Sequence, residues 1–232
     1  MNKILKKITT FFLAMSLTFS MGMAAFADEP TQEELLKQYY AALAKMQGTA
    51  QGANQNAAAD SSLEMVVYQK MMALKATFPE GMPYTNDTIY RSTHMKERKF
   101  VGAGCVAFAT AIQDNVFDPK AKVKTERTAL SNWALQHNVG SYTHVDGVWV
   151  PLANGVPYDG NDPVVRASFE KVWNTIRPGD VLNCQLHTFI VLSKDANGIT
   201  IAEGNYSGKV HWGRTISKEA LSRGLMWKQT MY

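Results

Sequence analysis

The sequence contains two cysteines and five histidines, the residue types from which nucleophiles and general bases are commonly drawn. Cys105 follows the small residues Gly102-Ala103-Gly104 and opens an apolar segment, so we expect it in the first turn of a helix. Unpaired backbone N–H groups and the positive end of the helix dipole would favour a thiolate there. Gly104 would let a substrate carbonyl approach the Cys105 N–H, which could hold an oxyanion. Cys105 is therefore the predicted nucleophile.

His187 is the predicted base, because it alone among the histidines lies in a strongly predicted strand of the sheet-forming half. After a turn at Asn197-Gly198, a second strand returns with Glu203 and Asn205, and either side chain could orient the imidazole. Two plainer interpretations stay open. His187 could be an ordinary core histidine, and Glu203 and Asn205 could simply end a strand at a turn.

The length of the loop between these two strands decides which face each side chain occupies. A two-residue loop would put Glu203 and Asn205 on the face opposite His187. We therefore predict a three-residue loop, 196–198, with Gly198 left-handed and a bulge, which sets Asn205 across from Phe189 and diagonal to His187.

Cys184 precedes His187 by three residues, so a regular strand would turn it to the opposite face, away from the site. That placement disfavours a Cys105–Cys184 disulfide. The disulfide is nevertheless the alternative explanation for two cysteines in an exported protein.

The N-terminal third predicts helices separated by a polar linker. Thr31 and Glu34 form a capping box for a helix over about 31–47, and the uncharged stretch 48–60 is typical of a linker. A second box, Ser61 with Glu64, opens a helix that ends before Pro79. Its apolar residues recur on one face that should pack on the core: Leu63, Val66, Val67, Met71, Leu74 and Phe78. Residues 79–100 should be irregular, and 102–118 should form a buried helix.

The rest of the chain predicts an α+β fold, with helices first and an antiparallel sheet later. Residues 126–138 have a helical pattern, Asp146-Gly147 indicates a hairpin, and Asp162-Pro163 should cap a helix that reaches about residue 174. From Ile176 onward, turn residues alternate with β-branched and aromatic ones, which predicts an antiparallel meander. A short helix over 218–222 and a strand over about 225–231 should complete the layout.

Residues 1–27 have the pattern of a secretory signal peptide: three lysines, an apolar run, then Ala25-Phe26-Ala27 at a cleavage site. The apolar run is too short for a stable membrane span, and none is expected after cleavage. Removing residues 1–27 from the 232 leaves 205, and the loss of Lys3, Lys6 and Lys7 lowers the net charge from +4 to +1. This near-neutral charge argues against a nucleic-acid partner. The remaining chain should comprise residues 28–60, a helix with linker, and one domain over 61–232.

The chain resembles the CHAP and NlpC-type papain-like peptidoglycan hydrolases in the order of three features. These are a cysteine at a helix start, a histidine on a strand, and Glu-Gly-Asn on the next strand. The resemblance rests on GAGCVAF and on GDVLNCQLHTFIVLSKDANGITIAEGNY, about 65 residues in all. It implies a papain-like core and a cell-wall peptide substrate, with no cofactor. In such an enzyme Cys105 would attack an amide carbonyl, His187 would shuttle the proton, and Glu203 with Asn205 would position the histidine. FPEGMPYTND and GNYSGKVHWGRTIS also resemble segments of uncharacterised secreted Gram-positive proteins.

Residues 120–175 form a longer insert between cysteine and histidine than the family pattern has, and the insert could narrow the cleft. Its His144 could reach the site, but it is interpreted as a surface histidine. Candidates for oxyanion donors or cleft lining are Gly104, Tyr84, Asn86, Tyr206 and Trp212, with His211 beside the last. No Cys or His pair has zinc-ligand spacing, so no metal is expected.

Three functions fit these residues. Amide hydrolysis through a thioester is the leading hypothesis. A transpeptidase or other acyl transferase would use the same residues, with an amine instead of water resolving the thioester. A non-catalytic domain that binds muropeptides or a protein would keep the fold with an unreactive Cys105. The sequence does not determine an oligomeric state.

Overall fold

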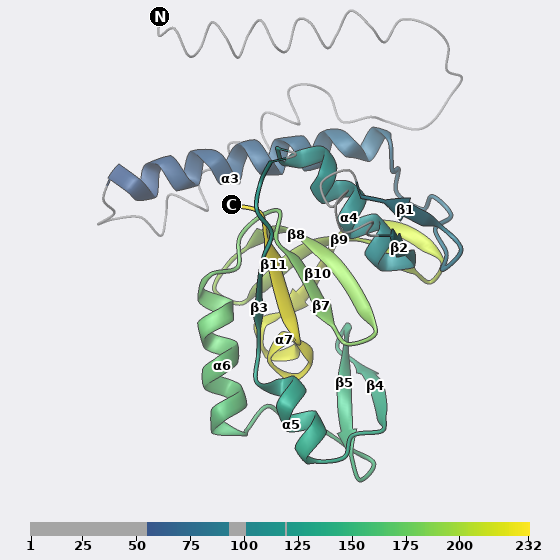
Figure 1. Cartoon of the computed structure of the whole chain (residues 1–232), viewed down its shortest axis with the longest axis vertical. Coiled ribbons are helices and arrows are strands. Elements are labelled where there is room, and N and C mark those ends of the chain that lie inside the picture. The colour runs from purple at the N-terminus through teal and green to yellow at the C-terminus, as the bar shows by residue number, and fades with distance from the viewer. Residues whose placement is uncertain (1–54, 93–100, 119) are drawn as a thin grey trace, which may run out of the picture. The chain divides into compact units, whose positions relative to one another are not determined.

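The main sheet of the computed structural model has six strands, and each pairs with its neighbours in antiparallel fashion (Figure 1). In spatial order they are β10 (Lys209–Ser217), β9 (Gly198–Tyr206), β8 (His187–Lys194), β7 (Val181–Cys184), β11 (Trp227–Thr230) and β3 (Lys124–Arg127). The first four are consecutive in the chain, which confirms the predicted meander. The structure describes residues 55–92, 101–118 and 120–232, with side chains described from residue 63. All of them belong to one compact unit, 54–232.

Both faces of this sheet are covered, which explains the almost unbroken apolar run along β8. Ile190 and Leu192 face a cluster that includes Phe108 and Ile112 of α4 (Gly104–Val116). The alternating residues Phe189 and Val191 face a second cluster on the other side. That cluster is built from α6 (Pro163–Asn174), α7 (Lys218–Gly224) and β5 (Val148–Ala153). The helices and antiparallel sheets make the fold α+β.

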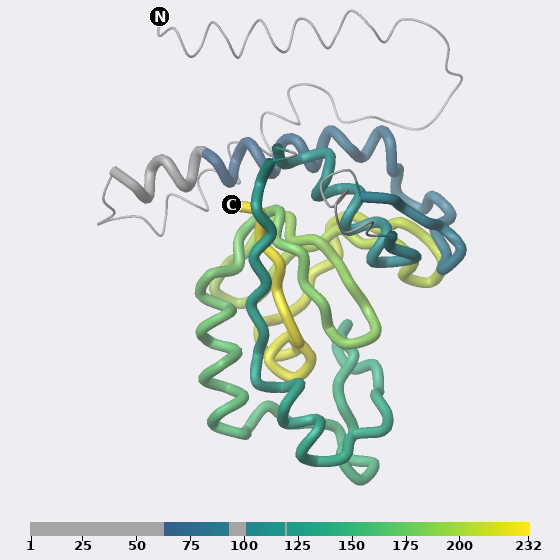
Figure 2. The backbone as a smooth tube through the Cα atoms, in the orientation of Figure 1, coloured from purple at the N-terminus to yellow at the C-terminus, as the bar shows by residue number. Residues whose placement is uncertain are grey.

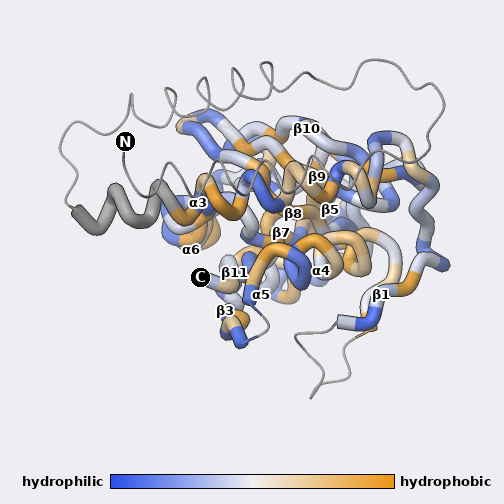
Figure 3. The backbone as a smooth tube through the Cα atoms, turned by 90° about the horizontal axis from the view of Figure 1, so that it is seen from above, coloured by the Kyte–Doolittle hydropathy of each residue, from blue (hydrophilic) through white to orange (hydrophobic). Residues whose placement is uncertain are grey.

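Helix α4 is the buried helix predicted over 102–118. Figure 3 colours much of its length as hydrophobic, and nine of its residues are buried. A two-stranded ribbon of β1 (Ile89–Arg91) and β2 (Val101–Ala103) leads directly into it. Strand β1 lies in the region predicted to be irregular, and β2 takes up residues 102 and 103 of the predicted helix, which therefore begins only at Gly104.

Helix α3 (Gln55–Ala73) continues into a 3-10 turn, Leu74–Ala76, and packs on α4 through Val67 and Met71. The predicted linker is wrong for residues 55–60, because this alanine-rich stretch has high helix propensity and extends α3. Leu63 and Val66 are 46% and 45% exposed, so only part of the predicted face is buried. The signal peptide and the helix predicted over 31–47 lie outside the described residues.

The predicted insert, 120–175, is integrated into the domain. Its strand β3 lies beside β11 at one edge of the main sheet, although the two strands are far apart in the sequence (Figure 2). It continues through α5 (Leu130–Gln136) to a small sheet of β4 (Ser141–Val145), β5 and β6 (Val156–Pro157). The predicted Asp146-Gly147 hairpin is confirmed: both residues have positive φ, as a two-residue turn that follows the twist of the strands requires.

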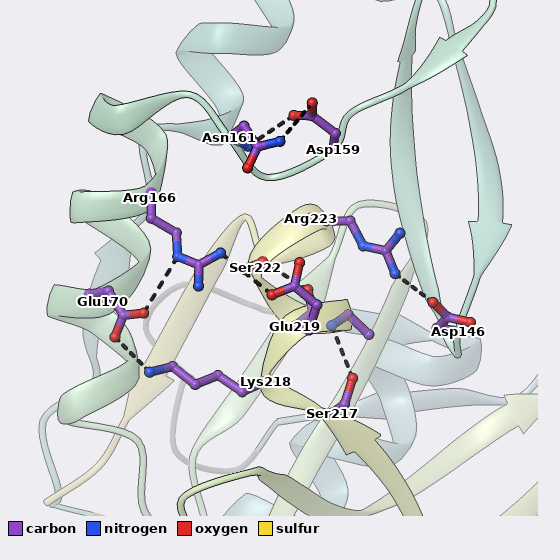
Figure 4. Close-up of polar contacts among 11 residues, drawn as sticks. Asp146, Asp159, Asn161, Arg166, Glu170, Ser217, Lys218, Glu219, Ser222 and Arg223 are labelled. Atoms are coloured by element: carbon purple, nitrogen blue, oxygen red, sulfur yellow. Dashed lines mark hydrogen bonds and ion pairs between the residues drawn. The ribbon is translucent and has the colours of Figure 1, made fainter.

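Helix α6 confirms the predicted cap, because the Asp162 carboxylate accepts hydrogen bonds from the Val164 and Val165 N–H groups at 2.9 and 3.0 Å. The close-up in Figure 4 shows how α6, α7 and the β4–β5 turn are tied together. Lys218 of α7 contacts Glu170 of α6 at 2.8 Å, and Arg223 of α7 contacts Asp146 at 2.5 Å. The β4–β5 hairpin is thus anchored to the body of the domain.

The three-residue loop predicted between β8 and β9 is wrong. Lys194 pairs with Ile199, so four residues, 195–198, lie between the paired residues of β8 and β9, and the last of them, Gly198, pairs with Ser217 of β10. Gly198 does not have a positive φ. Instead, the register shifts at a bulge between Val191 and Ser193. Continuing the shifted register places Glu203, not Asn205, across from Phe189.

Candidate functional site

Cys105 is the second residue of α4 and is partly exposed. The helix starts abruptly from β2, with Gly104 at a φ of +56° and its N–H bonded to the Thr88 carbonyl at 3.0 Å. A positive φ is readily adopted by glycine and strained for other residues. No side chain caps this helix start. The first-turn N–H groups and the dipole are therefore directed at the cysteine.

The Cys105 thiol is hydrogen-bonded to the His187 imidazole. Burial alone would raise the pKa of Cys105. The hydrogen bond and charge of His187, together with the backbone N–H groups of Thr188 and Val106, outweigh burial and lower this pKa. The pair can therefore exist as thiolate and imidazolium.

His187 is 9% exposed, and its Nε2 lies 2.7 Å from Oε2 of Glu203. Because Nε2 faces this carboxylate, Nδ1 is the nitrogen that remains for Cys105. Burial would lower the pKa of His187, but its hydrogen bonds to Cys105 and Glu203 raise it to about 9. The imidazole is thus held between a sulfur and a carboxylate.

Glu203 is completely buried, and Arg214 of β10 supplies its second partner. Arg214 donates from Nε to Oε1 at 2.5 Å and from Nη2 to Oε2 at 2.7 Å. Burial would raise the pKa of Glu203, but the bonds and charges of Arg214 and His187 lower it. Arg214 is not among the residues that the sequence predicted for the site. The four groups form one series: Cys105, His187, Glu203 and Arg214.

Two irregularities bring His187, Glu203 and Arg214 onto one face of the sheet. The bulge in β8 aligns Glu203 with Phe189 and so puts it on the His187 face. In β10 the register shifts between Trp212 and Arg214, with Gly213 at a φ of +94°. Simple alternation would leave Arg214 on the face of Trp212. A glycine followed by a basic residue was the sequence signal available for it.

Helix α4 packs on the face of the sheet opposite His187, on the side of Ile190 and Leu192. Cys105 therefore has to meet His187 at the end of a strand. His187 is the first residue of β8, and the Thr188 N–H beside it bonds the cysteine. The site is thus built where the start of α4 passes the beginning of β8.

Asn205 does not contact His187. It has a φ of +61°, and its Nδ2 donates to Oδ1 of Asn86 at 2.6 Å. A Cβ at Gly104 would lie 2.8 Å from Asn86 Oδ1 and 3.0 Å from Asn205 Nδ2. This pair of amides therefore stands directly beside the residue preceding Cys105. Asparagine tolerates the left-handed conformation that turns this side chain toward Asn86.

Tyr206 lies at the rim of the site. Its ring centroid is 6.1 Å from that of His187 and 6.2 Å from that of His144, and the Arg214 guanidinium carbon is 4.7 Å from the ring centroid. His144 is exposed, as expected, and reaches the site only through this ring. The β4–β5 hairpin thereby borders the site.

Two predicted cleft residues are held by the core instead, Tyr84 within it and Trp212 partly buried against it. Tyr84 is 3% exposed and packs edge-on against Phe108. Trp212 packs against the same ring and donates its Nε1–H to the Phe78 carbonyl at 2.7 Å. His211 is bonded to Glu80 at 2.8 Å and to the Tyr206 carbonyl at 3.2 Å, so it joins β10 to the segment before β1.

The predicted placement of Cys184 is wrong. Cys184 ends β7 and pairs directly with His187, the first residue of β8, so both side chains share one face. A hairpin turn at Gln185-Leu186 separates them, and alternation along a strand does not carry across a turn. Cys184 is fully buried in the core cluster, and burial raises its pKa. Both cysteines are free thiols.

Comparison with models of known protein families, with curated proteins and with solved structures finds no match to this chain. Among residues 55–92, 101–118 and 120–232, no three His, Cys, Asp or Glu side chains are grouped to hold a metal ion. No helix in those ranges is long and apolar enough to cross a membrane.

Proposed function

We propose that this chain is a secreted cysteine hydrolase with a papain-like core, and that it cleaves amide bonds in peptidoglycan peptides. The observation that carries the proposal is the series in which Cys105 bonds His187 and His187 bonds a buried Glu203. A thiolate nucleophile, an imidazole base and a carboxylate that orients the base are the parts that acyl transfer requires. A nucleophile helix packed on an antiparallel sheet that bears the histidine supports the papain-like core.

The first half-reaction forms a thioester. The Cys105 thiolate attacks the amide carbonyl carbon, and the carbonyl π electrons move onto oxygen to give a tetrahedral oxyanion. The Cys105 N–H and the amide of Asn86 would donate to this oxygen, since Asn86 uses only its Oδ1 to accept from Asn205. Nδ1–H of His187 then protonates the leaving amine as the carbon–nitrogen bond breaks.

The second half-reaction returns the enzyme to its starting state. Neutral His187 takes a proton from water, the hydroxide attacks the thioester, and the carbon–sulfur bond breaks to give the acid and the thiolate. Glu203 keeps the Nε2 proton in place throughout, so Nδ1 always faces the reacting atoms.

Peptidoglycan peptides are proposed as substrates because the motifs resemble those of wall hydrolases and because residues 1–27 have the pattern of an export signal. The exposed amide of Asn86 and the partly exposed amide of Asn205 beside Gly104 suit a peptide, which presents N–H and C=O groups to them.

The test is mass spectrometry of purified peptidoglycan after incubation with the mature wild-type protein or with Cys105→Ala. We expect new amine and carboxyl termini at one type of amide bond with the wild type alone. Identical products from both proteins would refute the hydrolase for this substrate. Iodoacetamide labelling of Cys105 at pH 6 tests the chemistry separately, since a free thiol with a pKa of about 8.5 is less than roughly 1% thiolate there.

A further inference from the structure

Arg214 touches both the buried carboxylate of the site and the hairpin that borders it. Its Nε and Nη2 donate hydrogen bonds to the two oxygens of Glu203, and its Nη1 donates to the Gly147 carbonyl at 3.1 Å. A Cβ on Gly147 would lie 2.5 Å from that same Nη1, so the guanidinium fits closely against the turn. The Asp146 carboxylate next to it is held by Arg223 at 2.5 Å.

We propose that Arg214 is a positioning residue that acts through Glu203: it keeps the buried carboxylate ionised and fixes its plane against His187. The inference rests on the proposed function. Arg214 itself does not touch the sulfur or the substrate carbonyl.

Charge balance gives the physical reason. Thiolate, imidazolium, carboxylate and guanidinium sum to zero, whereas the same buried site without Arg214 would carry a net negative charge. Buried carboxylates need charged or hydrogen-bonding partners, and Glu203 has only His187 besides Arg214 in the described structure. Without the guanidinium, Glu203 would draw the Nε2 proton toward itself, and the imidazolium that stabilises the thiolate would be lost.

The geometry adds a second contribution. A guanidinium with two parallel N–H bonds sets both the position and the rotation of a carboxylate, which a single ammonium cannot do. Gly147 braces the guanidinium from the other side, so the hairpin supports the orientation of Glu203. The predicted insert would thus belong to the active site.

The other titratable groups near this series come from every neighbouring element. They are Cys184 on β7, Tyr206 on β9, His144 on β4, His211 on β10 with its partner Glu80, and Asp146 of the hairpin with its partner Arg223 of α7. Cys184 is a buried thiol and Asp146 is already paired with Arg223, so Arg214 provides the positive charge for Glu203.

The test is the pH dependence of Cys105 alkylation by iodoacetamide, followed by peptide mass spectrometry from pH 4 to 10. In Arg214→Met we expect the acid limb of the rate profile to move up by about one pH unit, which makes alkylation about tenfold slower below it. Arg214→Lys, which keeps the charge without the fork, should shift the limb less. If Arg214→Met does not fold, Arg214→Lys still decides the question. An acid limb unchanged from wild type would show that the two parallel N–H bonds of the guanidinium are not needed.

Arg223→Met is the matched control, because it releases the same hairpin without touching Glu203, and its acid limb should stay at the wild-type pH. Arg214→Met combined with Glu203→Gln should shift the limb by less than the sum of the separate shifts, as coupling through one carboxylate requires. Additive shifts, or a stability loss in Arg214→Met with an unmoved limb, would overturn the inference. Slow alkylation of wild-type Cys105 at pH 6 would instead refute the proposed function itself.

Discussion

Gly204 of β9 packs closely against α4, and replacing it with alanine should disrupt both this packing and the reactivity of Cys105. A Cβ at this position would lie 2.5 Å from the Phe108 Cβ, 2.8 Å from its Cγ and 3.0 Å from a Tyr84 ring carbon. Ordinary carbon contacts begin at about 3.4 Å, so α4 and β9 would have to separate by about 0.9 Å. Phe108 is completely buried and packs against Phe78, Tyr84 and Trp212, which leaves it little room to move.

Overpacking of this kind costs about 1–3 kcal/mol. In a domain of this size the midpoint of thermal unfolding should fall by roughly 2–12 °C. Because α4 carries Cys105 and β9 carries Glu203, the separation should also slow alkylation of Cys105 at pH 6. Urea denaturation of Gly204→Ala measures the first effect, and iodoacetamide labelling measures the second.

Gly140→Ala is the matched control, since a Cβ there would meet nothing within 4 Å and the residue has no positive φ. Its free energy of unfolding should stay within about 0.5 kcal/mol of the wild type. If Gly204→Ala were equally neutral, the close packing of α4 on β9, and with it the route by which Cys105 reaches His187, would be refuted.

Three further predictions follow from single residues. A chromogenic disulfide reagent at pH 8 should titrate one thiol in the native protein and two in urea, because Cys105 is accessible and Cys184 is fully buried with a raised pKa; two native thiols would contradict that burial. Burial raises the pKa of Asp180 to about 6 despite Lys228 at 3.6 Å, so the folded state binds this proton more tightly than the unfolded chain, whose Asp pKa is about 3.9. The free energy of unfolding should therefore lose up to about 2 kcal/mol from this group as the pH rises from about 4 to 6.5. Asp180→Asn should remove that contribution in urea denaturation at each pH, and equal pH slopes would show that Asp180 does not titrate there. Asp162→Ala should lower the free energy of unfolding by about 1 kcal/mol through loss of the α6 cap, whereas Asp162→Asn should retain most of it.

Local chemistry was enough to predict several elements. The α6 cap at Asp162-Pro163 and the hairpin at Asp146-Gly147 follow from side-chain hydrogen bonding and positive φ, both of which act within a few residues. The buried helix that starts beside Cys105 and the antiparallel meander follow from apolar pattern and turn spacing. The sequence also identified Cys105, His187 and Glu203 as a group, and the structure brings these three together.

Sequence alternation failed wherever a strand was irregular. The bulge in β8 put Glu203 on the His187 face, and the left-handed Asn205 bonds Asn86 instead of His187. The turn at Gln185-Leu186 put Cys184 on the His187 face. The left-handed Gly213 brought Arg214 to Glu203. A bulge inserts one residue and reverses which face every later residue occupies, and its position depends on the neighbouring strand.

The sequence by itself therefore determined three side chains of the candidate site and the elements that carry them, since residue type, capping and periodicity are local properties. Only the tertiary structure decided that Glu203 and not Asn205 meets His187, which arginine meets that carboxylate, and that the 120–175 segment borders the site. The physical reason is that strand register and the meeting of α4 with the start of β8 depend on packing between segments far apart in the chain.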